Sequence, residues 1–142
     1  MIPLGAALSL ESELAYHLSI SEETPSNNTI RGMHYHDYKT LRKKWQWAVF
    51  AALNGKRPKV PLQQSAITIL RYSPSYLDWD NALGGLKPLL DCLVMPSKRN
   101  PDGLGLIQDD SPIFMPNPPF LQQLKCKRGE GKTELIIYKL NQ

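Results

Sequence analysis

The chain contains 142 residues, of which 42% are hydrophobic and 21% are charged, and this balance predicts a folded domain rather than a disordered segment. No stretch approaches the roughly 20 consecutive apolar residues that a membrane-spanning helix needs. The net charge of +4 and the isoelectric point near 9.1 favour a polyanionic partner without identifying it.

Two further features indicate a cytoplasmic protein. The apolar run at residues 2–10 has no Lys or Arg before it, which argues against a signal peptide. Cys92 and Cys126 form neither a CxxC motif nor a zinc-ligand pattern. We therefore expect two free thiols in a reducing compartment.

The first half of the chain is predicted to contain a strand, a helix and a second strand. Residues 1–12 resemble an N-terminal extension, and residues 13–20 show the apolar alternation of a strand that ends at the turn-rich segment 21–28. Apolar residues at helical spacing predict a helix over 37–53, and the β-branched run at 65–72 predicts a central strand. The apolar stripe of the helix comprises Tyr38, Leu41, Trp45, Ala48 and Ala52, and the other side carries Lys39, Arg42, Lys43 and Gln46.

The second half of the chain is less regular. Leucines at helical spacing predict a helix over 78–94, but a proline inside a helix removes a hydrogen bond and clashes one turn back. Either the regular helix begins near Leu86, with Pro88 in its first turn, or the helix is kinked there. Residues 106–108 are predicted to form a short strand, and 121–140 to form a terminal hairpin around a glycine-bearing turn.

These elements predict an α+β fold, in which a mixed sheet packs with two main helices and residues 13–142 form a single domain. Charge is unevenly distributed along it: residues 38–77 contain eight basic and no acidic residues, whereas residues 78–110 contain six acidic residues, all aspartates. A basic surface beside an aspartate cluster is typical of an enzyme that binds phosphates and a divalent cation. The alternative is a solvated helix face beside ordinary loop aspartates.

The aspartates have a spacing that suits metal binding. In an extended chain, residues two apart point to the same side, so Asp78 and Asp80 would present two carboxylates to one point. Asp109 and Asp110 follow the predicted short strand and would supply a third. Mg²⁺ prefers such oxygen ligands. The alternative is that Asp78 or Asp80 caps a helix and that Asp110 opens a loop turn.

A lysine accompanies these aspartates. If the helix runs from Asp80, Lys87 and Asp91 lie on the same face as Asp80. A lysine beside a metal-held phosphate neutralises the negative charge that develops as a phosphodiester breaks. The alternative is an ordinary i,i+4 pair between Lys87 and Asp91.

The order of these motifs resembles the RusA family of Holliday junction resolvases. The matching features are Ser-Asn-Asn at 26–28, the basic helix, D-x-D-N at 78–81, K-x-x-x-D-x-L at 87–93 and Asp-Asp at 109–110. They are collinear over roughly residues 13–140.

The resemblance implies a RusA-like fold and a homodimer, of a type encoded by phages and prophages, that makes paired, Mg²⁺-dependent nicks in four-way DNA junctions, with Mn²⁺ as a possible substitute. It implies that Asp78, Asp80 and Asp110 are metal ligands and that Lys87 is the catalytic lysine. Asn81 and Asp91 also match the motif. The residues expected to contact DNA are Asn27, Asn28, Arg31, Lys39, Arg42, Lys43 and Lys44.

The chain departs from the family in spacing. Asp80 and Lys87 are separated by about two helical turns rather than about one, and segments 95–105 and 111–119 are longer. There are two alternatives to a true resolvase. One is a non-catalytic clamp on branched DNA, against which the intact Asp78, Asp80, Lys87 and Asp110 argue; the other is a nuclease of the same chemistry that acts on flaps or forks.

Other candidate sites carry less weight. The His34-x-His36-Asp37 sequence lacks the further Cys or His of a zinc site. Trp45 belongs to the apolar stripe and is expected in the core, whereas Trp47 is open to either a core position or stacking on an unpaired base.

Overall fold

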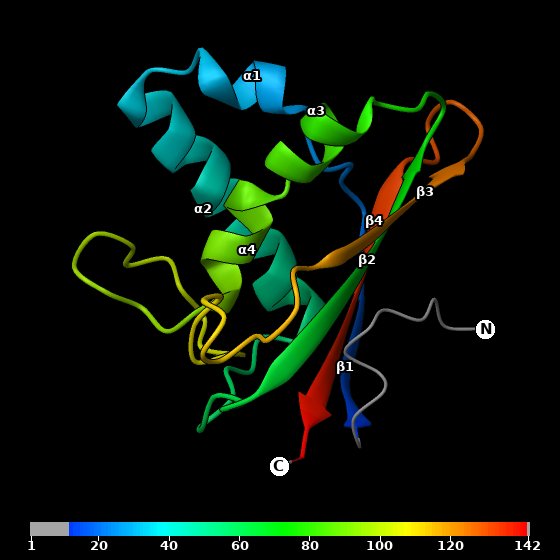
Figure 1. Cartoon of the computed structure of the whole chain (residues 1–142). Helices are drawn as coiled ribbons and strands as arrows, with labels where there is room; N and C mark the ends of the chain where they lie inside the picture. The colour runs from blue at the N-terminus through cyan, green and yellow to red at the C-terminus, as the bar shows by residue number, and fades with distance from the viewer. Residues whose placement is uncertain (1–11, 142) are drawn as a thin grey trace.

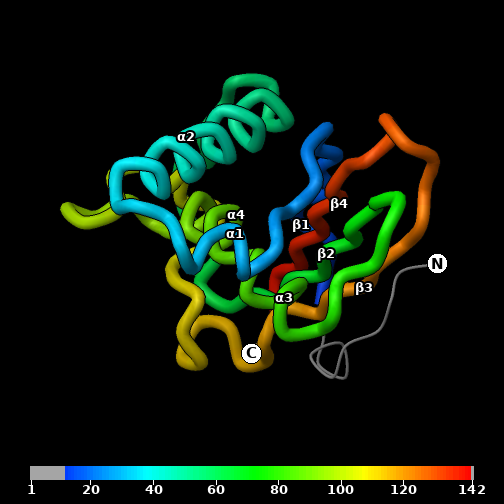
Figure 2. The backbone as a smooth tube through the Cα atoms, turned by 90° about the horizontal axis from the view of Figure 1, so that it is seen from above, coloured from blue at the N-terminus to red at the C-terminus, as the bar shows by residue number. Residues whose placement is uncertain are grey.

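A four-stranded sheet and four helices make up the computed structural model, which describes residues 12–141 (Figure 1). The strands lie in the order β1-β4-β2-β3; β4 is antiparallel to both β1 and β2, and β3 is parallel to β2. The described helices lie to one side of this mixed sheet (Figure 2). The elements are β1 (Ser12–Ile20), α1 (Asn27–Arg31), α2 (Tyr35–Ala52), β2 (Ser65–Ser73), α3 (Trp79–Gly84), α4 (Lys87–Leu93), β3 (Phe120–Lys125) and β4 (Lys132–Leu140).

The α+β class and the mixed sheet are thus confirmed, and so are the strands predicted at 13–20 and 65–72 and the helix predicted at 37–53. The N-terminal extension predicted at 1–12 lies outside the described residues except for Ser12, the first residue of β1. No helix in the described part of the chain combines the length and apolar character needed to cross a membrane.

The prediction of a terminal hairpin was wrong. β3 and β4 do not pair with each other, because β2 lies between them. Consecutive residues of β4 from Leu135 to Tyr138 are all buried, as expected of a strand with partners on both edges. β3 is more polar, with half-buried Gln122 and Gln123, and forms the edge of the sheet.

The leucine-rich segment forms two short helices rather than one. α3 ends at Gly84, and α4 begins at Lys87 with Pro88 in its first turn, where a proline costs no helical hydrogen bond. The prediction that Pro88 lies in the first turn is confirmed, and the kinked alternative is not observed. A continuous helix from Asp80 is excluded, so Lys87 and Asp91 do not share a helix face with Asp80.

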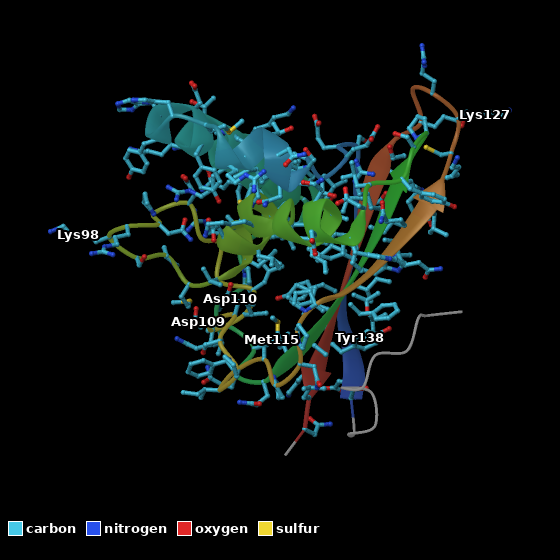
Figure 3. All side chains as sticks on the ribbon, turned by 45° about the horizontal axis from the view of Figure 1, so that its top comes forward. Lys98, Asp109, Asp110, Met115, Lys127 and Tyr138 are labelled. Atoms are coloured by element: carbon cyan, nitrogen blue, oxygen red, sulfur yellow. The ribbon has the colours of Figure 1, made fainter. Side chains whose placement is uncertain are left out.

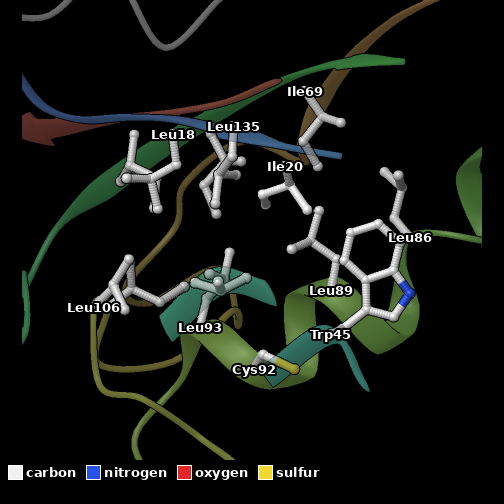
Figure 4. Packing of buried hydrophobic residues seen from close by; sticks show 14 of the residues in the cluster. Leu18, Ile20, Trp45, Ile69, Leu86, Leu89, Cys92, Leu93, Leu106 and Leu135 are labelled. Carbon is white, nitrogen blue, oxygen red and sulfur yellow. The ribbon is translucent and has the colours of Figure 1, made fainter. Parts of the chain in front are cut away.

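The main core lies between the sheet and helices α2 and α4 (Figure 4). Trp45, only 2% exposed, packs near Leu86 and Leu89, and it belongs to the same core cluster as the strand residues Ile20 and Leu135. The core position predicted for Trp45 is therefore confirmed. A second, smaller cluster on the other face of the sheet consists of Ala66, Ile136, Tyr138 and Leu140.

The segment that leads to Asp109 and Asp110 runs along the end of α4. Leu104 donates a backbone hydrogen bond to the carbonyl of Cys92 at 2.8 Å, and Leu106 donates to that of Leu93 at 2.9 Å. The strand predicted at 106–108 is reduced to one parallel bridge between Ile107 and Leu62. These bonds fix the chain just before the two aspartates.

Candidate functional site

Helices α1 and α3 meet at the two glycines of the leucine-rich segment. A Cβ atom on Gly84 would collide with the side chain of Asn27, and one on Gly85 would overlap the backbone carbonyl of Pro25. Only glycine allows so close an approach. The contact places the Ser-Asn-Asn segment beside the D-x-D-N motif, and the backbone N–H of Asn28 donates to Oδ1 of Asn81 at 3.2 Å.

Asp78 and Asp80 lie at the exposed start of α3. Asp78 occupies the N-cap position, but its carboxylate makes no capping hydrogen bond. Oδ1 of Asp78 instead accepts from Nδ2 of Asn81 at 2.7 Å, so Asn81 links Asp78 to Asn28. Asp80 lies in the first helical turn. The chain is therefore helical rather than extended at Asp80, and the same-side argument for the two carboxylates does not hold, since helical residues two apart do not face each other.

Lys87 is the exposed first residue of α4, and its Nζ lies 3.6 Å from Oδ1 of Asp91. The other carboxylate oxygen of Asp91 accepts from the hydroxyl of Tyr38 at 2.6 Å. Burial, the hydrogen bond to Asp91 and the charge of Asp91 all raise the pKa of Tyr38, which therefore stays protonated as the donor. Asp91 is thus engaged by two side chains and holds α2 and α4 together.

Asp109 and Asp110 lie side by side below α4 (Figure 3). Partial burial of the Asp110 carboxyl raises its pKa, and so do the negative charges of Asp109 and, more weakly, Asp91. Burial is the largest of these causes, and the two neighbouring carboxylate charges add to it.

The three predicted metal ligands are not gathered in this structure. Within residues 12–141 there is no group of three or more His, Cys, Asp or Glu side chains arranged to hold a metal ion. Asp78 and Asp80 lie at the start of α3, whereas Asp110 follows the segment bonded to the end of α4. The carboxylate oxygens suit a hard cation by their chemistry, but their arrangement does not form a finished site. His34 and His36 stack on each other at 5.2 Å and likewise belong to no such group.

Most of the predicted DNA-contacting residues are accessible. Asn28, Arg31, Lys39, Lys43 and Lys44 are exposed, and Asn27 is half-buried against α3. Arg31 donates to Oδ1 of Asn28 at 2.9 Å, which joins Arg31 to the same hydrogen-bonded chain as Asn81 and Asp78.

Arg42 is the exception, because it is only 5% exposed. Its Nε lies 2.9 Å from Oδ2 of buried Asp102, and the guanidinium also lies over the ring of Tyr38. The assignment of Arg42 to the DNA-contacting face was therefore wrong. The fully buried residues of α2 are Arg42, Trp45 and Val49, at i, i+3 and i+7. The predicted apolar stripe is confirmed at Leu41, Trp45, Ala48 and Ala52, which lie in or against the main core, but not at Tyr38.

Two contacts were missed by the sequence analysis. Tyr38 was assigned to the apolar stripe, yet its hydroxyl bonds to Asp91, and Asp102 was not recognised as the partner of Arg42. The spacing of Arg42 from Trp45 carried a signal for its burial, but nothing local identifies the partner aspartate. No protein family, curated protein or solved structure matched the chain in the comparisons made with known proteins.

Proposed function

We propose that this chain is a divalent-metal-dependent endodeoxyribonuclease of the RusA type that resolves four-way DNA junctions by paired phosphodiester nicks, acting as a homodimer. One observation carries the proposal. The Ser-Asn-Asn and D-x-D-N motifs are far apart in the sequence, yet Asn28 and Asn81 are joined by a hydrogen bond, and Asn81 in turn holds Asp78. These bonds bring the two motifs together across the contact between α1 and α3 and fix the orientation of the Asp78 carboxylate.

In this proposal Asp78, Asp80 and Asp110 hold Mg²⁺, for which Mn²⁺ would substitute. When bound, such an ion polarises the phosphate and lowers the pKa of a coordinated water. Asp110 has to approach the start of α3 for all three carboxylates to share the ion, since no such group exists in the described residues. Asp110 is included because its exposed carboxylate lies beside that of Asp109, directly after the segment that is bonded to the end of α4.

The remaining residues have roles that need no metal. Asn81 orients Asp78 by donating to one oxygen, which leaves the other oxygen available. Lys87 is exposed at the start of α4 and carries the charge that would stabilise the phosphorane-like transition state. Asp91 restrains the Lys87 ammonium, while the exposed Arg31, Lys39, Lys43 and Lys44 contact the DNA backbone.

The proposal is tested with purified protein and labelled four-way, flap, fork and linear DNA of matched sequence, with Mg²⁺, with Mn²⁺ and with EDTA. Metal-dependent, symmetric nicks confined to the four-way junction are the expected result. Cleavage of flaps or forks in preference to the junction would support metal-dependent phosphodiester hydrolysis but would contradict the four-way junction as the substrate. Tight junction binding without cleavage in either metal would overturn the proposal in favour of a clamp.

A further inference from the structure

A small aromatic pocket lies near the end of α2. It has a volume of about 220 Å³ and is lined by Gln46, Trp47, Phe50, Arg57 and Leu104. Leu104 is buried, whereas Trp47 is 64% exposed and meets Phe50 edge to face, with ring centroids 6.3 Å apart. A tryptophan this exposed at the mouth of a pocket presents a planar apolar surface that the core does not use.

The chain after α2 brings positive charge to this pocket. Asn54 and Gly55 both adopt left-handed backbone conformations, which end the helix and turn the chain back past Phe50. The exposed basic residues that follow are Lys56, Arg57 and Lys59. Within residues 12–141 none of the three belongs to an ion pair, in contrast to Lys44, which Glu22 holds at 3.2 Å.

The pocket also continues a basic row along α2. Lys39, Lys43 and Trp47 are successive i,i+4 positions on one side of the helix, about 6 Å apart along its axis. All three are exposed, and no acidic residue among the described ones lines the pocket; the Nζ of Lys43 lies 3.4 Å from Oδ1 of buried Asp102. A ligand lying along this row would meet two ammonium groups, then an aromatic face, then the Arg57 guanidinium.

We propose that this pocket binds an unpaired base of single-stranded DNA, with the base stacked on Trp47 and the neighbouring phosphates held by Lys43 and Arg57. The volume is below the roughly 300–1,000 Å³ of pockets for drug-sized ligands, which suits a single ring system. Aromatic side chains beside a positively charged groove are the usual means of binding single strands. The choice of DNA as the ligand rests on the proposed function. The exposed aromatic face and the positive charge of the pocket are observed independently of that function.

The test measures binding of a fluorescently labelled oligodeoxythymidine and of a paired duplex of equal length, both in EDTA so that no cleavage interferes. Trp47→Leu keeps an apolar side chain without an aromatic face, and Trp47→Phe restores the face. We expect Trp47→Leu to weaken single-strand binding by about 5- to 150-fold with little change for the duplex. Trp47→Phe should recover most of the affinity, and Arg57→Ala should lower the salt dependence.

Phe120→Leu is the matched control, because Phe120 is an exposed aromatic residue at the start of β3 that neither lines the pocket nor belongs to the row, and its replacement should leave single-strand binding unchanged. Equal binding by Trp47→Leu and the unsubstituted protein would overturn the proposal. So would a Trp47→Leu protein that loses self-association in light scattering but binds DNA normally, since the pocket would then be a contact between copies. Failure of junction cleavage is a separate result, because the oligonucleotide measurement involves neither a junction nor a metal ion.

Discussion

The aspartates between residues 78 and 110 are alike in sequence but differ in environment, as Asp102 and Asp80 illustrate. Asp102 is 4% exposed, and Arg42 and Lys43 both pair with its carboxylate. Asp80 is exposed in the first turn of α3. The carboxylate that already has cationic partners serves the fold, whereas the accessible one is available to a ligand. An aspartate cluster in a sequence is therefore informative about chemistry only after the structural aspartates have been set apart.

The largest effect on stability is expected at the structural aspartate. Asp102→Ala should lower the free energy of unfolding by about 3–5 kcal/mol, because it leaves the Arg42 guanidinium buried without its partner. Urea unfolding measures this change. The matched control is Glu22→Ala, which removes the exposed partner of Lys44 and should cost at most about 1 kcal/mol. Equal losses of unfolding free energy in the two variants would contradict the structural role assigned to Asp102.

Lys87 is expected to give the next largest effect, on rate rather than on stability. Lys87→Ala should reduce junction cleavage by about 10²–10³-fold while junction binding remains. Lys87→Arg should rescue poorly, because a planar guanidinium places its charge differently from an ammonium. Single-turnover cleavage is the measurement, with Lys127→Ala as the control, since Lys127 lies far from Asp110 at the β3–β4 connection (Figure 3).

A Lys87→Ala protein that cuts normally but unfolds at a lower temperature would show that Lys87 only pairs with Asp91. The catalytic cation would then come from elsewhere. Lys98 and Arg99, both exposed in the loop after α4, would be the first candidates to replace.

A smaller effect is expected from the exposed lysines of α2, which contrast with buried Arg42. Replacing Lys43 and Lys44 by Ala should weaken binding to every DNA form and lower the slope of log affinity against log salt by about 0.9 for each lost phosphate contact. Fluorescence anisotropy at several salt concentrations measures the slope. An unchanged slope would mean that the two lysines serve only their ion pairs with Asp102 and Glu22.

The smallest effect is expected on the sheet, at Glu134. Burial alone would raise the pKa of Glu134, but hydrogen bonds from His17 and Tyr72 and the charge of Lys132 lower it. A carboxyl with a lowered folded-state pKa stabilises the fold above its unfolded-state pKa, and this contribution is lost as the pH falls through the folded-state value.

Glu134→Gln should therefore cost about 0.5–1 kcal/mol near neutral pH. The difference from the unsubstituted protein should shrink as the pH falls below the ordinary glutamate value of 4.5. Urea unfolding at a series of pH values measures it, and a difference independent of pH would contradict the assigned contacts.

Much of the fold followed from periodicity in the sequence. Alternation predicted β1 and helical spacing predicted α2, whereas Pro88 left two alternatives, of which the structure has the helix that begins just before it. Strand partners could not be read the same way. β3 and β4 are neighbours in sequence, yet β2 lies between them, because it pairs in parallel with β3 and antiparallel with β4. These pairings join segments far apart in the chain and leave no local signal. The short α1 was missed because its main signal is one capping residue, Ser26.

The candidate site was less predictable, because it depends on which side chains meet across the fold. The residue types at 78–81 predicted a metal site. Their contact with Asn28 depends on Gly84 and Gly85, which pack directly against residues 25–27. Nothing in the neighbouring sequence predicts that packing. Arg42 and Lys43 are adjacent and equally basic, yet one is buried. Helical phase separates them: Arg42 lies beside the predicted apolar stripe, which packs on the core through Trp45, and its side chain reaches buried Asp102.

The most direct test of the account compares two exposed aspartates, each in the first turn of its helix. Asp80 is in α3 and is assigned to the metal; Asp37 is in α2 and is not. Cleavage and gel-shift assays on a four-way junction with Mg²⁺ should show that Asp80→Asn abolishes cutting while binding persists or tightens, since lost negative charge no longer repels phosphate. Asp37→Asn should cut normally. An Asp80→Asn protein that cuts at nearly the unsubstituted rate would contradict the account.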